Sequence, residues 1–341
     1  MGDKTILSMM RSLYELNQKQ SFTMPRQNKL LYNLFVYANN CVDKNSLFYK
    51  YLKHLYSYNR HRPVYLSVRN RYIQTLMTEC LKECEKIIET DKKAAVLIGI
   101  NYKGTEGELR GCENDIFSTK KVLLEKYGFE EKNILVLTES SKDAKYKPTR
   151  ANILAAIEWL VRKGNEGFSS LWFQYSGHGY YFEDRDGDEK DGKDECLVTC
   201  DNYAIVDDEL RLRLVNRIPK DAKLFCLMDC CHSGTMLDLR YKYAINKNLL
   251  VKENNYQTES NVLAISGCMD SQTSADAQFS DGEFAGALTR NFLSLLKKHN
   301  YFPKLSVLMK DLYYGLQSQR FTQLPQLTSS KELEKDAMFR V

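Results

Sequence analysis

The stretch AKLFCLMDCCHSG, residues 222–234, decides the fold of this chain more than any other. It opens with a continuous apolar run, which is typical of a strand covered on both faces, and it ends in a turn of small and reactive residues. A second stretch, SSLWFQYSGHG at 169–179, has the same pattern. Ligands of parallel sheets bind at the carboxyl ends of the strands. The two stretches therefore predict a buried parallel sheet with a functional site at one edge.

Strands and helices alternate on either side of these two stretches. Strand-like runs cover 94–102, 133–139 and 261–268, and we expect 324–330 to be an edge strand. Helical periodicity is found at 113–128, 150–164, 207–218, 282–299 and 304–320. This alternation predicts an α/β fold, with a mainly parallel central sheet flanked by helices on both faces.

Residues 1–93 differ from the rest of the chain. They show helical patterning and carry 16 Lys and Arg against 8 Asp and Glu, whereas the remaining 248 residues carry 33 against 36. We interpret 1–93 as an N-terminal helical leader that could serve as a pro-segment, and 94–341 as the main domain. The basic charge is explained by a solvated face. It predicts no nucleic-acid partner, because no recognisable binding motif accompanies it.

Composition and hydropathy narrow the class of protein further. With 341 residues, 43% of them hydrophobic and 27% charged, the chain can bury a sizeable core. We find no signal peptide and no run of eighteen apolar residues, so we expect no membrane association and a cytoplasmic location, with the nucleus as the alternative. The ten cysteines are then expected to be reduced thiols.

The turns that end the two stretches carry a thiol and an imidazole. One reads Tyr175-Ser176-Gly177-His178-Gly179 and the other Asp229-Cys230-Cys231-His232-Ser233-Gly234. A thiol becomes a reactive thiolate beside a base, and imidazole serves at neutral pH. The glycines leave backbone N–H groups free to approach an oxyanion. Either turn alone would be explained by a buried cysteine or a surface histidine, but together they predict nucleophilic catalysis.

Several motifs resemble the metacaspases, caspase-fold cysteine peptidases of clan CD, family C14, and more closely their type I branch. They follow in order along residues 94 to about 335: GINYKGTEGELRGCENDI (99–116), PTRANI (148–153), YSGHG (175–179), DGKDECLVTCD (191–201), IVDDEL (205–210), DCCHSGTMLDL (229–239) and SGCMDSQTSADA (266–277). The resemblance implies a caspase-like fold. It divides the domain into a large-subunit-like part at 94–239, a linker at 240–260 and a small-subunit-like part at 261–341.

The resemblance also implies the roles of the catalytic residues. Cys231 is the expected nucleophile, His178 its base, and the amides of Gly179 and Cys231 the oxyanion donors. Cys230 is the alternative nucleophile, but side chains alternate along a strand, so only one of the two can face His178. No third side chain is available to orient His178, and we expect a backbone carbonyl to do so.

Family members prefer to cleave after Arg or Lys, and the resemblance implies a matching pocket. It is formed by Asp115 and Asp229, with Cys112 and Ser176 lining it. Asp229 lies two residues before Cys231 and so shares its face of the strand. An enzyme that cleaves after Asn or Asp, and a catalytically silent scaffold of the same fold, are the alternatives. The paired acids argue against the first, and the intact Cys231 and His178 against the second.

Many family members require calcium, and the resemblance implies that Ca²⁺ is bound by Asp194, Asp207, Asp208 and Asp238. Hard oxygen ligands of this kind suit Ca²⁺. Asp207 is also a candidate helix N-cap. Four basic residues make self-cleavage in the linker chemically feasible: Arg240, Lys242, Lys247 and Lys252. We expect a monomer that acts on proteins or peptides containing Arg or Lys.

Overall fold

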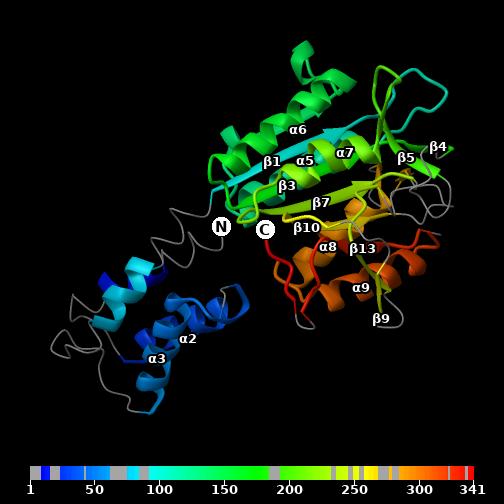
Figure 1. Ribbon diagram of the computed structural model, residues 1–341. Coiled ribbons are helices and arrows are strands. Elements are labelled where there is room, and N and C mark those ends of the chain that lie inside the picture. The colour runs from blue at the N-terminus through cyan, green and yellow to red at the C-terminus, as the bar shows by residue number, and fades with distance from the viewer. Residues whose placement is uncertain are drawn as a thin grey trace. The chain divides into compact units, whose positions relative to one another are not determined.

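Figure 1 shows the computed structural model of the chain. It describes residues 9–15, 24–41, 44–61, 75–83, 92–183, 193–231, 236–244, 249–252, 257–267, 276–278, 284–321, 323–334 and 337–341. The chain forms two compact units. One comprises Met1–Lys92 with Lys126–Gly128 and Arg340, and the other comprises Lys93–Glu125, Phe129–Phe339 and Val341. Within the described residues, no helix combines the length and the apolar character needed to cross a membrane.

The N-terminal unit is helical, as the sequence predicts. It contains α2 (Met24–Cys41), α3 (Leu47–His61) and helical turns at 9–15 and 75–83. Leu31 and Leu34 of α2 are fully buried, as are Leu52 and Leu55 of α3. The rings of Phe35 and Tyr56 stack with centroids 4.3 Å apart. Because it has a hydrophobic core of its own, this segment is a folded body and not merely a solvated basic extension.

The larger unit is built on an eight-stranded sheet in the order β2-β1-β3-β7-β10-β13-β8-β9. The first five strands are parallel neighbours: β2 (Ile134–Thr138), β1 (Lys93–Gly99), β3 (Ser170–Ser176), β7 (Lys223–Asp229) and β10 (Asn261–Ser266). The last three run antiparallel to their neighbours: β13 (Gln326–Ser329), β8 (Tyr241–Ala244) and β9 (Leu249–Lys252).

Helices cover both faces of this sheet (Figure 1), which confirms the predicted α/β class. They are α5 (Cys112–Lys126), α6 (Arg150–Asn165), α7 (Asp207–Arg213), α8 (Ala287–Lys298) and α9 (Leu305–Ser318), with 3-10 turns η1 (Glu131–Asn133), η2 (Ala144–Tyr146) and η3 (Val215–Arg217). Phe173 of β3 packs in one core with residues of α6 and α7. The neighbouring Trp172 points the other way, onto Phe292 of α8.

Two expectations about the end of the chain are wrong. The strand predicted at 324–330 is not at the edge, because β13 lies between β10 and β8. The predicted linker 240–260 is also not a plain connection, since it contributes β8 and β9 to the sheet. Both strands are only four residues long. β8 pairs non-locally with β13, Tyr243 opposite Leu327, and β9 pairs with β8. Such short runs carry too little periodicity to be distinguished from loops in the sequence.

Small antiparallel sheets extend from the carboxyl edge of the main sheet. One has the order β4-β5-β6, formed by β4 (Gly179–Glu183), β5 (Lys193–Val198) and β6 (Ala204–Val206). The other pairs β11 (Asp276–Gln278) with β12 (Phe284–Gly286). β4 follows directly after His178, and β12 leads directly into α8. Residues 184–192 of the acidic run lie outside the described residues.

Candidate active site

The turns that carry Cys231 and His178 leave adjacent parallel strands. β3 and β7 pair with Ser176 opposite Asp229, and the amide of Gly177 donates to the carbonyl of Asp229 at 3.3 Å. His178 and Cys231 each lie two residues beyond this pair. The register therefore places His178 and Cys231 at the same carboxyl edge of the sheet, just after the ends of two neighbouring strands.

Gly179 brings the two turns into direct contact. A Cβ added at this position would lie 2.0 Å from the carbonyl oxygen of Cys231 and 3.4 Å from Sγ of Cys230. The first distance is far inside van der Waals contact and involves backbone, so only glycine fits there. The absence of a side chain thus allows the chain after His178 to lie against the chain at Cys231.

Burial distinguishes the two adjacent cysteines. Cys230 is fully buried and belongs to the main hydrophobic core. Cys231 keeps 9% of its surface exposed. A nucleophile must be reachable by its substrate, so Cys231 meets this condition and Cys230 does not. His232 lies outside the described residues.

The imidazole of His178 is held by a backbone carbonyl. Its Nε2 lies 2.6 Å from the carbonyl oxygen of Gly107, in the loop between β1 and α5. Since a carbonyl only accepts, the hydrogen bond requires the proton on Nε2 and leaves Nδ1 as the basic nitrogen. Gly107 was not identified from the sequence, where nothing marks its carbonyl as different from others in that loop.

Two buried tyrosines fix the backbone at His178. The amide of His178 donates to the Tyr102 hydroxyl at 2.8 Å, and the Tyr175 hydroxyl donates to the carbonyl of His178 at 2.8 Å. The two hydroxyls lie 2.8 Å apart, and the Tyr102 ring packs on the imidazole with centroids 4.5 Å apart. Burial raises the pKa of both phenols, so both stay protonated at neutral pH.

Glu139 positions Tyr102 in turn. Its Oε2 accepts hydrogen bonds from the amides of Asn101 and Tyr102, both at 2.7 Å. Tyr102 has φ of 51°, a left-handed conformation that costs a non-glycine residue about 1 kcal/mol or more. The carboxylate at the end of β2 stabilises this turn. Neither Tyr102 nor Glu139 could be assigned this role from the sequence, because their contact joins positions 37 residues apart.

The two predicted pocket acids come together at the start of α8. Asp115 and Asp229 are 2% and 3% exposed. Asp115 accepts from the Ser176 hydroxyl at 2.7 Å and from the Gly286 amide at 3.0 Å, and Asp229 accepts from the Thr289 amide at 2.8 Å. These donors satisfy oxygens of both buried carboxyl groups at the N-terminus of α8.

Cys112 lies slightly apart from the other predicted pocket residues. It is the first residue of α5, and it is buried. Its thiol is close enough to Tyr102 and Tyr175 to interact with both electrostatically. The structure therefore groups Asp115, Asp229 and Ser176 directly, and it places Cys112 near the tyrosine pair that holds His178.

The predicted calcium ligands lie around the start of α7. Asp207 is buried and accepts from the amides of Glu195 and Asp208 at 2.9 and 2.8 Å. Burial, with a contribution from the Asp194 carboxylate, raises the pKa of Asp207 to about 6. The N-cap of α7 is Val206, so the expectation that Asp207 caps this helix is wrong. Asp207 is instead its first helical residue.

The other two predicted calcium ligands, Asp208 and Asp238, also lie near α7, but they do not complete a metal site. Asp208 is exposed, whereas Asp238 is buried, and the Asp238 carbonyl accepts from Arg211 of α7 at 2.7 Å. Across the part of the chain that the structure describes, no three His, Cys, Asp or Glu side chains lie close enough to hold a metal ion. The four acids thus do not fit a complete calcium site as they stand.

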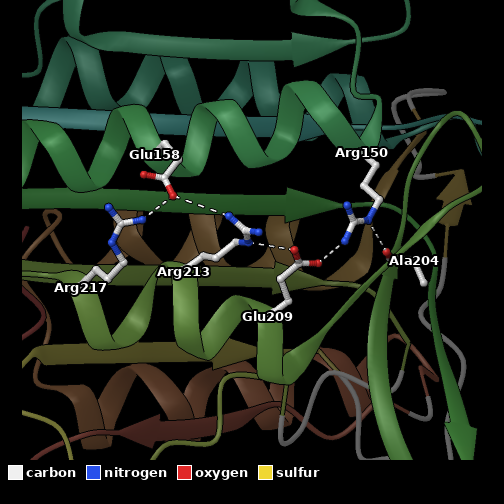
Figure 2. A network of polar contacts seen from close by, with 6 residues as sticks. All are labelled: Arg150, Glu158, Ala204, Glu209, Arg213 and Arg217. Atoms are coloured by element: carbon white, nitrogen blue, oxygen red, sulfur yellow. Dashed lines mark hydrogen bonds and ion pairs between the residues drawn. The ribbon is translucent and has the colours of Figure 1, made fainter.

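A network of charged residues ties α7 to α6, as Figure 2 shows. Glu209 of α7 accepts from Arg150 of α6 at 2.5 Å and from Arg213 at 2.8 Å. Glu158 of α6 in turn pairs with Arg213 at 3.9 Å and with Arg217. The network therefore fixes the helix whose first turn carries Asp207 and Asp208.

An accessible cysteine and an oriented histidine at the carboxyl edge of such a sheet are the arrangement expected of cysteine-type peptidases with a caspase-like fold. Comparison with known proteins agrees. The family profile described as metacaspase, peptidase C14 domain, matches residues 92–240. The chain belongs to the metacaspase family, as its motifs predicted, and membership indicates a cysteine-type peptidase.

Similar proteins include two fungal relatives and one solved structure. Metacaspase-1 of Cryptococcus neoformans (strain JEC21) is 34% identical over 303 residues, which cover 73% of this chain and 65% of that protein. Metacaspase-1 of Mycosarcoma maydis is 35% identical, with 73% of each chain covered. The crystal structure of a protein from Geobacter sulfurreducens is 25% identical with a TM-score of 0.52, covering 73% of this chain and 97% of that one.

Proposed function

We propose that this chain is a cysteine endopeptidase that cleaves after Arg or Lys, with Cys231 as nucleophile and His178 as base. The observation that carries the proposal is the orientation of His178. Its Nε2 is bonded to the carbonyl of Gly107, and the chain that follows it lies against Cys231 through Gly179. Nδ1 is then the nitrogen that receives a proton from the nearby thiol.

The reaction is acyl transfer through a thioester. Nδ1 of His178 takes the proton of the Cys231 thiol, and the thiolate attacks the substrate carbonyl carbon. The amides of Gly179 and Cys231 stabilise the oxyanion. The C–N bond then breaks as His178 returns its proton to the leaving amine, and a thioester with Cys231 remains. Water, deprotonated by His178, hydrolyses the thioester and restores the thiol.

Preference for a basic residue follows from the paired acids. Asp229 lies on β7 two residues before Cys231, so the side chain that precedes the scissile carbonyl falls on the side of this acid. Asp115 stands beside it, and both are almost completely buried. A buried cation needs such carboxylates to replace its hydration. An Asp side chain would instead be repelled, and Asn would leave both charges unpaired.

Calcium dependence is part of the proposal. When bound, Ca²⁺ would supply positive charge that neutralises closely spaced carboxylates. The support is electrostatic: Asp194 contributes to the raised pKa of Asp207, and a divalent cation would relieve that repulsion. We propose Asp194 and Asp207 as the core of the site. Asp208 and Asp238 would have to move closer to complete it, since no three such side chains among the described residues are grouped closely enough to hold the ion as they stand.

Fluorogenic peptides ending in Arg, Lys, Asp or Asn test the proposal, each assayed with millimolar calcium and with a chelator. We expect calcium-dependent release from Arg and Lys peptides only. Cys231→Ala should abolish it, whereas the matched variant Cys230→Ala should retain it. Cleavage after Asp or Asn instead would contradict the pocket, and silence on every peptide would favour a catalytically silent scaffold.

We further propose that the enzyme is a monomer in the cytoplasm and that it processes itself. Among the candidate sites, Lys242 lies within β8, whose backbone pairs with β13 on one side and β9 on the other. A protease must bind its substrate as a free extended segment, so cleavage there requires β8 to leave the sheet. Arg240 stands just before this strand, and Lys247 lies outside the described residues.

A further inference from the structure

Gly286 occupies the point where the two pocket acids meet α8. It is the last residue of β12 and the N-cap of α8, with φ of −65° and ψ of 132°. Any L-residue adopts this extended conformation, so the backbone does not require glycine here. Its amide donates to both oxygens of Asp115 at 3.0 Å. The reason for glycine must therefore lie in the space beside its Cα.

That space is filled by the pocket acids. A Cβ added at position 286 would lie 2.3 Å from Oδ2 of Asp229 and 2.6 Å from Oδ2 of Asp115. Both distances are well below van der Waals contact, which for non-bonded heavy atoms is roughly 3.5 Å. The two carboxylates, from different elements, therefore converge on one point.

The carboxylates cannot easily move away from that point. Both are nearly fully buried, and hydrogen bonds hold Asp115 to Ser176 and Asp229 to the Thr289 amide. A methyl group at position 286 would have to displace at least one of them. The substitution would therefore disturb the positions of the two carboxylates, because the backbone conformation at residue 286 already suits alanine.

We propose that Gly286 is a specificity-determining residue: its missing side chain allows Asp115 and Asp229 to stand together and so sets the preference for Arg or Lys. This inference rests on the proposed function, but it concerns a residue that contacts both acids and acts through them. Substitution should thus reduce recognition of the positive charge without changing the Cys231–His178 pair.

Gly267 provides a matched control beside the same acid. A Cβ at this position would lie 3.6 Å from Oδ1 of Asp229, 3.5 Å from Leu288 and 3.4 Å from Gln323. These are ordinary contact distances, so Gly267→Ala makes the same chemical change next to Asp229 without a steric conflict.

The test compares the full-length wild type with G286A and G267A. Values of kcat/KM are measured for peptides ending in Arg and in citrulline, its uncharged analogue, and alkylation of Cys231 by iodoacetamide reports on the catalytic pair independently of the pocket. We expect G286A to lower the Arg-to-citrulline ratio at least tenfold, mainly through KM for the Arg peptide, with alkylation within twofold of wild type. G267A should keep the wild-type ratio.

An unchanged ratio in G286A, in an enzyme whose wild type cleaves Arg peptides, overturns the inference alone. A wild type that does not prefer Arg overturns the proposed pocket itself. If G286A fails to melt cooperatively, the triple variant D115A/D229A/G286A is compared with D115A/D229A. Removing both close contacts should restore folding and give a ratio equal to that of D115A/D229A. A triple variant that does not fold, or whose ratio differs from that of D115A/D229A, contradicts the inference.

Discussion

Replacing Tyr102 with Phe removes a buried hydroxyl that accepts from the His178 amide at 2.8 Å and contacts the Tyr175 hydroxyl and the Val198 carbonyl at 2.8 and 2.7 Å. The ring that packs on the imidazole stays in place. Each net hydrogen bond contributes about 1 kcal/mol, and an amide left unsatisfied in the interior adds to the loss. The Tyr175 hydroxyl also lies 2.7 Å from the Val198 carbonyl, but its single proton serves either this carbonyl or that of His178. We therefore expect the free energy of unfolding to fall by about 2 kcal/mol.

The activity of this variant should fall as well, because the amide that fixes His178 has lost its partner. We expect kcat to decrease by roughly tenfold, the effect of a small misplacement of a catalytic group, with little change in KM. Urea unfolding and peptide hydrolysis measure the two effects. Tyr203→Phe is the control, since Tyr203 is 62% exposed and should lose less than about 0.5 kcal/mol. Stability and kcat both equal to those of the control would refute the proposed role of the Tyr102 hydroxyl.

Other predictions concern charge and self-cleavage. The pKa of Asp207 is raised from 3.8 to about 6, so the folded state holds its proton more tightly and stability is lost as pH rises from about 4 through 6, by at most about 3 kcal/mol. With a chelator present, Asp207→Asn should raise the Tm at pH 8 but not at pH 4. An equal shift of the Tm at both pH values would show that the raised pKa of Asp207 is not the reason. Glu158→Ala breaks the ion pairs with the half-exposed Arg213 and Arg217, so the free energy of unfolding in urea should fall by no more than about 1 kcal/mol. A loss above about 3 kcal/mol would show that the ion pairs of Figure 2 stabilise the fold far more than we infer. Mass spectrometry of self-cleaved protein should find no cut after Lys242 under native conditions, and early cleavage there would show that β8 does not stay in the sheet.

The parallel core of the fold could be predicted from the sequence because its strands are continuous apolar runs. β2, β3, β7 and β10 each lie within a predicted strand, β1 begins one residue before the predicted run, and α5 and α6 follow the predicted periodicity. The Thr149 hydroxyl caps α6 by accepting from the Asn152 amide. By contrast, β8 is stabilised by pairing with β13, far along the chain, and β9 by pairing with β8; the four residues of each strand carry no such signal.

The candidate site divides in the same way. Cys231, His178, Asp115 and Asp229 lie in motifs whose residue types indicate their chemistry. Every residue has a backbone carbonyl, so the residue type does not indicate which carbonyl contributes to a site. The Gly107 carbonyl, which holds His178, therefore could not be identified from the sequence. Gly286 escaped notice for a related reason: its importance comes from the space it leaves for two acids distant in sequence.

Covalent trapping of the nucleophile tests the central claim most directly. The full-length protein is incubated with calcium and a peptidyl-arginine chloromethyl ketone, which alkylates a catalytic cysteine or histidine only after its Arg has been bound. Peptide mapping by mass spectrometry then locates the label. We predict one label, a thioether on Cys231 formed as chloride leaves, prevented by Cys231→Ala and by Asp115→Asn with Asp229→Asn. A label on Cys230, or equal labelling by a reagent with Asp in place of Arg, would contradict the assignment of nucleophile and pocket.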